Sequence, residues 1–238
     1  MSIAEILKQE GSALYSSFET LEKGNKPENK IYLLGVNPGG KITKDNYTSI
    51  LEHLDNHEYN CNNEIWYNSY FDENWTKYDD NTRRGKSKYQ LRIKSLFDYL
   101  KLNLREIIAS NLIFFRSRNI NDLPDIAKKN FDDLANIFWP VHEYILNEKD
   151  IRVIISIGNG NESAYNYIKN NIAIINPEKI LDNIGHKNYK LKYFYFHFNN
   201  KNVLCLGYPH FSRYAIDNNL ENESHKIIVG QIREMIVE

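Results

Sequence analysis

Residues 31–40 read Ile-Tyr-Leu-Leu-Gly-Val-Asn-Pro-Gly-Gly. The first five are mostly apolar and too few for a stable helix, so they predict a short buried β-strand. The Asn-Pro-Gly-Gly segment that follows is typical of a turn, because proline fixes φ and glycine adopts conformations that other residues avoid. A buried strand that runs directly into such a turn places Asn37 at the edge of a sheet.

The rest of the chain alternates similar strands with amphipathic helices. Three further apolar runs predict strands at residues 107–115, 151–158 and 202–207. Apolar residues with helical spacing predict helices at residues 2–22, 88–101, 125–147 and 222–237. Residues 190–198 are interpreted as an extra strand or a hairpin arm. This alternation predicts an α/β fold, a three-layer α/β/α sandwich around a central, mostly parallel four-stranded sheet.

Length and composition suit one domain over residues 1–238, with an irregular, aromatic-rich insertion at about residues 55–85. The formal net charge is −1, so DNA binding would require a local cluster of cations. Cys61 and Cys205 form no CxxC pair, and no apolar run is long enough to cross a bilayer. We therefore expect a cytoplasmic monomer with no metal, no cofactor and no membrane partner.

The first loop has two interpretations. The phosphate-loop pattern GxxxxGK matches from Gly35 to Lys41, but Ile42 stands where a magnesium-binding hydroxyl is required, and Pro38 lacks a backbone N–H. This alternative, a nucleotide-processing enzyme, is disfavoured. In the second interpretation Asn37 lies at the floor of a pocket, and the glycines let a ligand approach the backbone closely.

Ligands of parallel sheets bind beyond the carboxyl ends of the strands, which here selects residues 37–40, 111–118, 158–161 and 208–214. In these loops, Gly-Val-Asn-Pro-Gly at residues 35–39 resembles the first motif of the uracil-DNA glycosylase superfamily. Tyr-Pro-His-Phe-Ser at residues 208–212 resembles a variant of its second motif. The resemblance covers residues 30–237, and it implies a DNA glycosylase that acts without metal or cofactor on double- or single-stranded DNA.

The resemblance assigns roles to individual residues. Asn37 would position the attacking water, His210 would stabilise the departing base, and Asn111 would read the base. If the prolines of the second motif are aligned, Tyr208 takes the usual histidine position, whereas alignment of the histidines puts Ser212 in register. The remaining base contacts would come from Gly35, Val36, Pro38, Gly39, Tyr208 and Ser212.

A flipped base also needs an aromatic wall and nearby cations. The segment after the first motif offers Tyr47, Trp66, Tyr67 and Trp75, of which Tyr47 and Trp66 are favoured. Residues 83–94 hold six cations in twelve residues and no acid. The candidate DNA-binding residues are Arg83, Arg84, Lys86, Lys88, Arg116, Arg118 and Arg213.

The target base stays open at this stage. Uracil is one candidate, and the altered second motif together with the long 55–85 segment also allows a bulkier pyrimidine, such as a hypermodified cytosine of phage DNA in an antiviral role. A catalytically silent DNA-binding or sensing module with the same fold is the alternative. The pair His53 and His57 has metal-ligand spacing but no evident third ligand, so it is interpreted as an exposed helix face.

Overall fold

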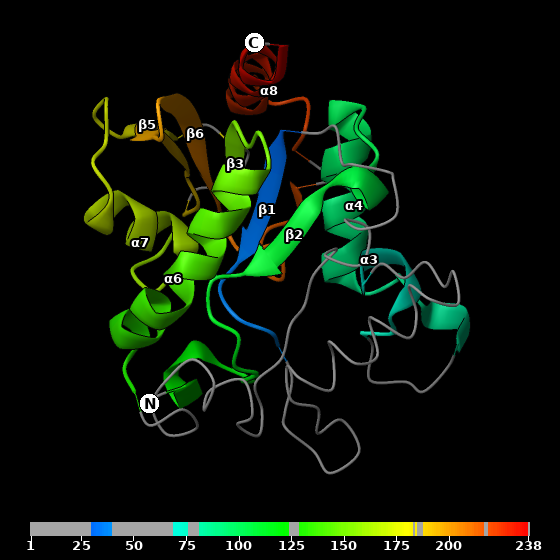
Figure 1. Ribbon diagram of the computed structural model, residues 1–238. Helices are drawn as coiled ribbons and strands as arrows, with labels where there is room; N and C mark the ends of the chain where they lie inside the picture. The colour runs from blue at the N-terminus through cyan, green and yellow to red at the C-terminus, as the bar shows by residue number, and fades with distance from the viewer. Residues whose placement is uncertain are drawn as a thin grey trace.

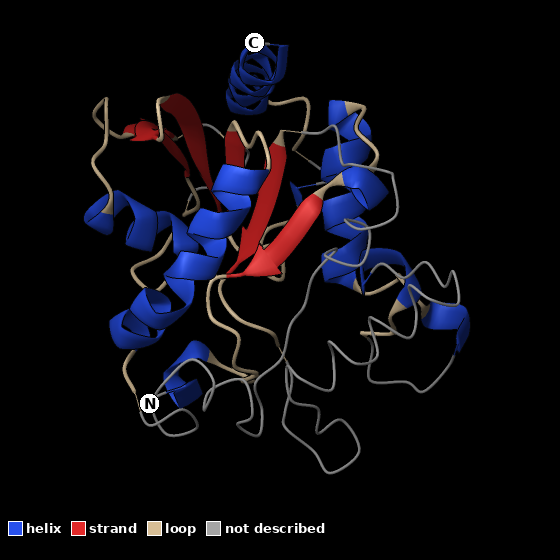
Figure 2. Cartoon of the chain, viewed as in Figure 1, coloured by secondary structure: helices blue, strands red, loops and turns tan. Residues whose placement is uncertain are grey.

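The computed structural model (Figures 1 and 2) describes residues 30–39, 69–75, 81–123, 129–182, 184, 188–216 and 219–237. The helix predicted over residues 2–22, the histidine pair at 53 and 57, and most of the 55–85 segment lie outside these residues. Among the described residues, no helix has the length and apolar character needed to span a bilayer.

The sheet has six strands in the order β2-β1-β3-β6-β5-β4, so the prediction of four strands is wrong in number, although the α/β class is confirmed. Strands β2, β1, β3 and β6 pair in parallel, whereas β5 and β4 add an antiparallel edge. The bounds of the strands are β1 Ile31–Gly35, β2 Ile108–Asn111, β3 Val153–Ile157, β4 Lys179–Leu181, β5 Leu191–Phe198 and β6 Lys201–Tyr208.

The antiparallel edge follows from a tight hairpin. Asn199 and Asn200 join β5 to β6 with φ angles of 44° and 62°. Two consecutive residues with positive φ give a turn whose twist matches that of the flanking strands, and asparagine tolerates this conformation better than most residues. The extra strand anticipated at residues 190–198 is therefore the arm of a hairpin with β6.

Helices cover both faces of the sheet, which confirms the three layers (Figure 1). Alternate residues of β1 face opposite layers: Tyr32 and Leu34 pack with α6 and α7, and Ile31 and Leu33 pack with α4 and α8. The helices are α3 Ser69–Asp72, α4 Lys88–Leu100, α6 Phe131–Glu148, α7 Ala164–Asn171 and α8 Glu223–Val237, with 3-10 turns at Asn81–Arg83, Leu104–Glu106 and Ile120–Asp122.

Strand β2 is shorter than the apolar run that predicted it. It ends at Asn111, and residues 112–115 remain buried as a loop that packs on α6, with the rings of Phe114 and Phe138 4.8 Å apart. A buried loop and a buried strand have the same apolar composition, so composition alone could not find this boundary.

Two buried histidines are kept neutral by burial, and their hydrogen bonds fix which ring nitrogen carries the proton. The Nε2 atom of His142 lies 3.1 Å from the Leu112 carbonyl and must donate to it, while its Nδ1 accepts from the Tyr32 hydroxyl at 2.7 Å. The Tyr214 hydroxyl donates to the Ile184 carbonyl at 2.7 Å and so accepts from Nε2 of His225 at 3.0 Å. Burial lowers the pKa of each histidine to about 4.

The stability of the fold is expected to fall in mild acid. An unfolded histidine has a pKa of about 6.5, so between this value and the lowered folded pKa the unfolded chain binds more protons, and the free energy of unfolding decreases as the pH falls. From pH 7 to pH 5 we expect a loss of about 2 kcal/mol for each of His142 and His225, measured by urea unfolding.

Replacement of a buried histidine tests the cause of this loss. His142→Gln should remove about half of the pH dependence, whereas His197→Gln, at an exposed position on β5, should leave it unchanged. An equally steep decline in His142→Gln and in the parent protein would show that other groups cause it.

Candidate active site

The carboxyl ends of four parallel strands meet at one edge of the sheet. In the paired registers, Gly35 of β1 lies beside Asn111 of β2, and Ile157 of β3 lies beside Tyr208 of β6. Strand β3 separates β1 from β6, and strands in a sheet are about 4.8 Å apart, so the ends of β1 and β6 are about 10 Å apart. Asn111, at the end of β2, and the loops that carry Asn37 and His210 therefore lie at the same edge of the sheet.

The amide of Asn37 has a fixed orientation. Its Nδ2 donates to the Phe115 carbonyl at 3.1 Å and to Ser117 Oγ at 2.8 Å, and it lies 3.0 Å from the carbonyl of Pro38. A carbonyl only accepts hydrogen bonds, so the nitrogen must face the loop after β2 and Oδ1 must face the other way. No donor among the described residues reaches Oδ1, which leaves this oxygen available to a water or a ligand.

Asn111 lies across Gly35. A Cβ atom at Gly35 would lie only 2.4 Å from Oδ1 of Asn111, so the side chain occupies the space that glycine leaves empty. Register and strand alternation place this amide on the α4 side of the sheet. Asn111 is half-buried and its side chain makes no hydrogen bond with the described residues, so both its donor and its acceptor remain available.

His210 is a neutral ring with a defined proton. The backbone N–H of Ser212 donates to its Nδ1 at 3.2 Å, and the Ser212 hydroxyl lies 2.7 Å from the same atom. Since Nδ1 accepts, the proton of the neutral ring is on Nε2. Although the side chain is exposed at the surface, the protein atoms around the ring and, to a lesser extent, the charge of Arg213 lower the pKa of His210.

An aromatic row connects His210 to the start of α4. The ring of Tyr89 lies 5.4 Å from that of His210, and Trp75 lies 5.9 Å from Tyr89. Arg92 of α4 also donates to the carbonyl of Phe211, which ties the loop after β6 to this helix. Thus His210, like Asn111, lies on the α4 side of the sheet.

The predicted basic cluster adjoins this row. Arg83, Arg84, Lys86 and Lys88 are all exposed, immediately before and at the first turn of α4. Gly85, with φ +64°, fixes the turn between them, because its N–H donates to the Glu73 carbonyl at 2.8 Å. These cations and the N-terminus of α4 together favour an anion beside Tyr89 and His210.

The remaining residues of the predicted site differ in position and burial. Tyr208 is fully buried in the core, which leaves its side chain no surface for contact with a base. Arg116 donates to the Gly39 carbonyl at 2.7 Å and so links the first two loops, whereas Arg118 and Arg213 are exposed. Beside Asn37, Pro38 is buried and Gly39 is exposed. The side chain of Val36 lies next to Gly158, 3.8 Å from where a Cβ atom of that residue would be. Tyr47, Trp66, Tyr67 and Lys41 lie outside the described residues.

Sequence reasoning missed two residues of this site. Tyr89 is the only aromatic residue within the basic stretch 83–94, and such interleaving of aromatic and basic residues could have indicated it. Ser117 lies in the selected loop 111–118, but its contact with Asn37, 80 residues away in the chain, gave no local signal.

No family model, no curated protein and no solved structure matches this chain.

The contact between Gly35 and Asn111 can be tested by a double-mutant cycle. Gly35→Ala should destabilise the protein by about 1–3 kcal/mol, because the new methyl group collides with the Asn111 amide. In an Asn111→Ala background the same change should cost much less. Gly39→Ala is the matched control, since a Cβ there meets no atom within 4 Å. Equal costs of Gly35→Ala in both backgrounds, measured by urea unfolding, would contradict this geometry.

Proposed function

We propose that this chain is a monofunctional DNA glycosylase, which hydrolyses the bond between deoxyribose and a pyrimidine base flipped out of DNA. The observation that carries the proposal is the neutral His210 ring, with its proton on Nε2, at the same sheet edge as the Asn37 and Asn111 amides. In this proposal His210 donates a hydrogen bond to the departing base, and Asn37 accepts one from the attacking water. Asn111 offers both a donor and an acceptor to the edge of the base.

The reaction breaks the bond between C1′ and the base nitrogen, and the electron pair leaves with the base. The oxygen of a water then bonds to C1′, and a proton of that water ends on the released base. Positive charge develops on the sugar in the transition state. The Asn37 amide takes up no proton near neutral pH, so its Oδ1 orients the water by accepting a hydrogen bond rather than by acting as a base.

Most of the rate must therefore come from stabilising the negative charge on the departing base. Nε2–H of His210 is suited to donate to a base carbonyl oxygen, and one such preorganised donor is worth about 3–4 kcal/mol. A lowered pKa supports this role, because the ring stays neutral at pH 7 and keeps accepting from the Ser212 N–H.

Asn111 supports recognition of a pyrimidine base, but its amide fits uracil and cytosine equally well. Its amide offers one donor face and one acceptor face, which match the edge of uracil in one orientation and that of cytosine in the other. The target base in this proposal is uracil or a modified cytosine, such as a hypermodified base of phage DNA. Excision of either would leave an abasic site, in repair or in antiviral defence.

The surrounding charge supports DNA as the carrier of the base. A base must leave the helix stack to reach such a site, at a cost of a few kcal/mol. Phosphate contacts with Arg84, Lys86 and their exposed neighbours would offset this cost.

The test is mass spectrometry of bases released from DNAs that carry uracil, other damaged pyrimidines and phage-type modified cytosines. On the substrate that is cleaved, we expect His210→Ala and Asn37→Ala each to lower the single-turnover rate by about 100- to 1000-fold, through loss of the base donor and of the water acceptor. His197→Ala, an exposed histidine on β5, is the matched control and should retain full activity.

Two results would contradict the proposal. Release of no base from any of these DNAs would exclude a glycosylase, and DNA binding that persists in Asn37→Ala would then indicate a silent binding or sensing module. Full activity in His210→Ala, with circular dichroism unchanged, would reject the role of this ring.

The basic cluster predicts the salt dependence of DNA binding. If Arg84 and Lys86 each neutralise one phosphate, the double variant Arg84→Gln/Lys86→Gln should reduce the slope of log affinity against log salt by about 1.8. Lys179→Gln, an exposed cation on the opposite edge strand β4, should leave the slope unchanged. Fluorescence anisotropy with labelled DNA measures the slope for the parent protein and for each variant, and equal slopes in all three proteins would place the DNA elsewhere.

A further inference from the structure

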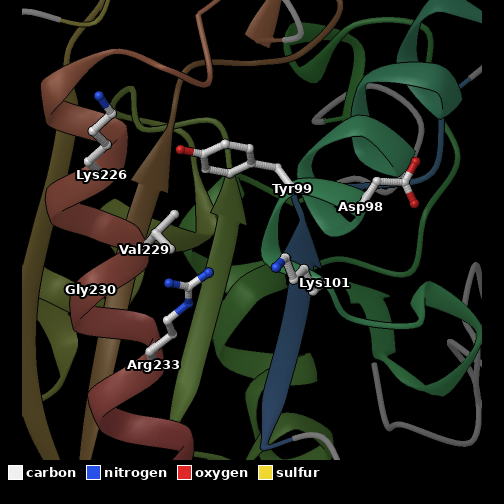
Figure 3. Close-up of a pocket in the computed structure, with 7 residues that line it drawn as sticks. All are labelled: Asp98, Tyr99, Lys101, Lys226, Val229, Gly230 and Arg233. Atoms are coloured by element: carbon white, nitrogen blue, oxygen red, sulfur yellow. The ribbon is translucent and has the colours of Figure 1, made fainter.

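A groove of about 440 Å³ lies between α4 and α8, away from the candidate active site (Figure 3). Its walls come from the end of α4 and the middle of α8, and its lining residues are Asp98, Tyr99, Lys101, Lys226, Val229, Gly230 and Arg233. Residues in an α-helix rise 1.5 Å each, so Tyr99 lies about 15 Å along α4 from Tyr89, which contacts His210.

The groove is rich in positive charge. Lys101, Lys226 and Arg233 line it, all three are exposed, and none forms an ion pair with any residue that the structure describes. In Figure 3 the guanidinium of Arg233 and the ammonium of Lys101 extend into the space between the helices from opposite walls, whereas the carboxylate of Asp98 points away from α8. Both cations line the same groove and neither has a counter-ion among the described residues, so a bound anion would be attracted by both.

An aromatic and apolar surface completes the groove. The ring of Tyr99 extends from α4 toward α8 (Figure 3), and the buried side chain of Val229 lies on the opposite wall. Gly230 presents bare helix backbone, with no atom within 4 Å of where a Cβ would be. A flat molecule could therefore lie against Tyr99 and approach α8 closely.

Buried polar atoms lie behind this wall. Tyr208 and His225 stack with their ring centroids 5.7 Å apart, and the Tyr208 hydroxyl and His225 Nδ1 have no hydrogen-bond partner among the described residues. Tyr208 belongs to the apolar cluster between the sheet and the helices α4 and α8, and Tyr99 packs against the same cluster. One unused donor and one unused acceptor thus remain buried on the side of the sheet that α4 and α8 cover.

We propose that this groove binds a small phosphate-bearing molecule of nucleotide size, with its phosphate between Lys101 and Arg233 and its planar group against Tyr99. Arginine binds phosphate through two parallel hydrogen bonds, and lysine adds a point charge. The volume lies within the range of small-molecule sites. This site is independent of the proposed glycosylase activity.

Isothermal titration calorimetry at low salt tests the site with adenosine 5′-monophosphate, adenosine and inorganic phosphate as separate probes. The monophosphate should bind the parent protein more tightly than either of its parts. Arg233→Gln and Lys101→Gln should each weaken this binding about tenfold or more, because each removes a charge-assisted hydrogen bond. Tyr99→Leu should weaken binding of the monophosphate but not of inorganic phosphate.

A matched control separates this groove from the candidate active site. Arg213→Gln, an exposed cation beside His210, should not change the affinity for the monophosphate, and Arg233→Gln should not change the salt dependence of DNA binding. Absence of binding, or affinity unchanged by Arg233→Gln, would overturn the proposal. Weaker DNA binding in Arg233→Gln would also overturn it, by identifying the groove as a contact for a nucleic-acid strand.

Discussion

The parallel pairing of β1 with both β2 and β3 is the constraint on which the rest of this structure depends. Since β1 is buried on both faces, its backbone can satisfy its polar groups only through these two ladders, which fixes the register of all three strands. The register sets Gly35 beside Asn111 and brings the loops after β1, β2 and β6 to one edge. The candidate active site is a consequence of this alignment.

Hydrogen bonds to backbone groups fix the orientation or the tautomer of three polar side chains. The Phe115 carbonyl orients the amide of Asn37, the Leu112 carbonyl fixes the proton of His142, and the Ser212 N–H fixes that of His210. A carbonyl can only accept and an amide N–H can only donate, so each contact leaves one arrangement. The ring of His210, whose pKa is lowered by burial and by Arg213, thereby carries its proton on Nε2 without a carboxylate partner among the described residues.

The two ends of α4 serve different surfaces. Its first turn carries exposed cations and Tyr89, and these adjoin His210. Its last turn forms, with α8, the groove that holds Lys101 and Arg233. One amphipathic helix can do this because its apolar side stays in the core along its whole length, including Ile93 and Phe97, while its ends face solvent.

The sequence alone predicted the α/β class, the four strands that pair in parallel and the helices at residues 88–101 and 222–237, each correct to within one residue at its ends, because apolar periodicity is a local property of the chain. It also predicted site roles for Asn37 and His210, since both follow buried strands, and these roles stay predictions. Only the tertiary structure decided the hairpin edge, the burial of Tyr208, the support of Asn37 by Ser117 and the position of Tyr89 beside His210. These features join residues far apart in the chain, and no local pattern encodes which distant groups will meet.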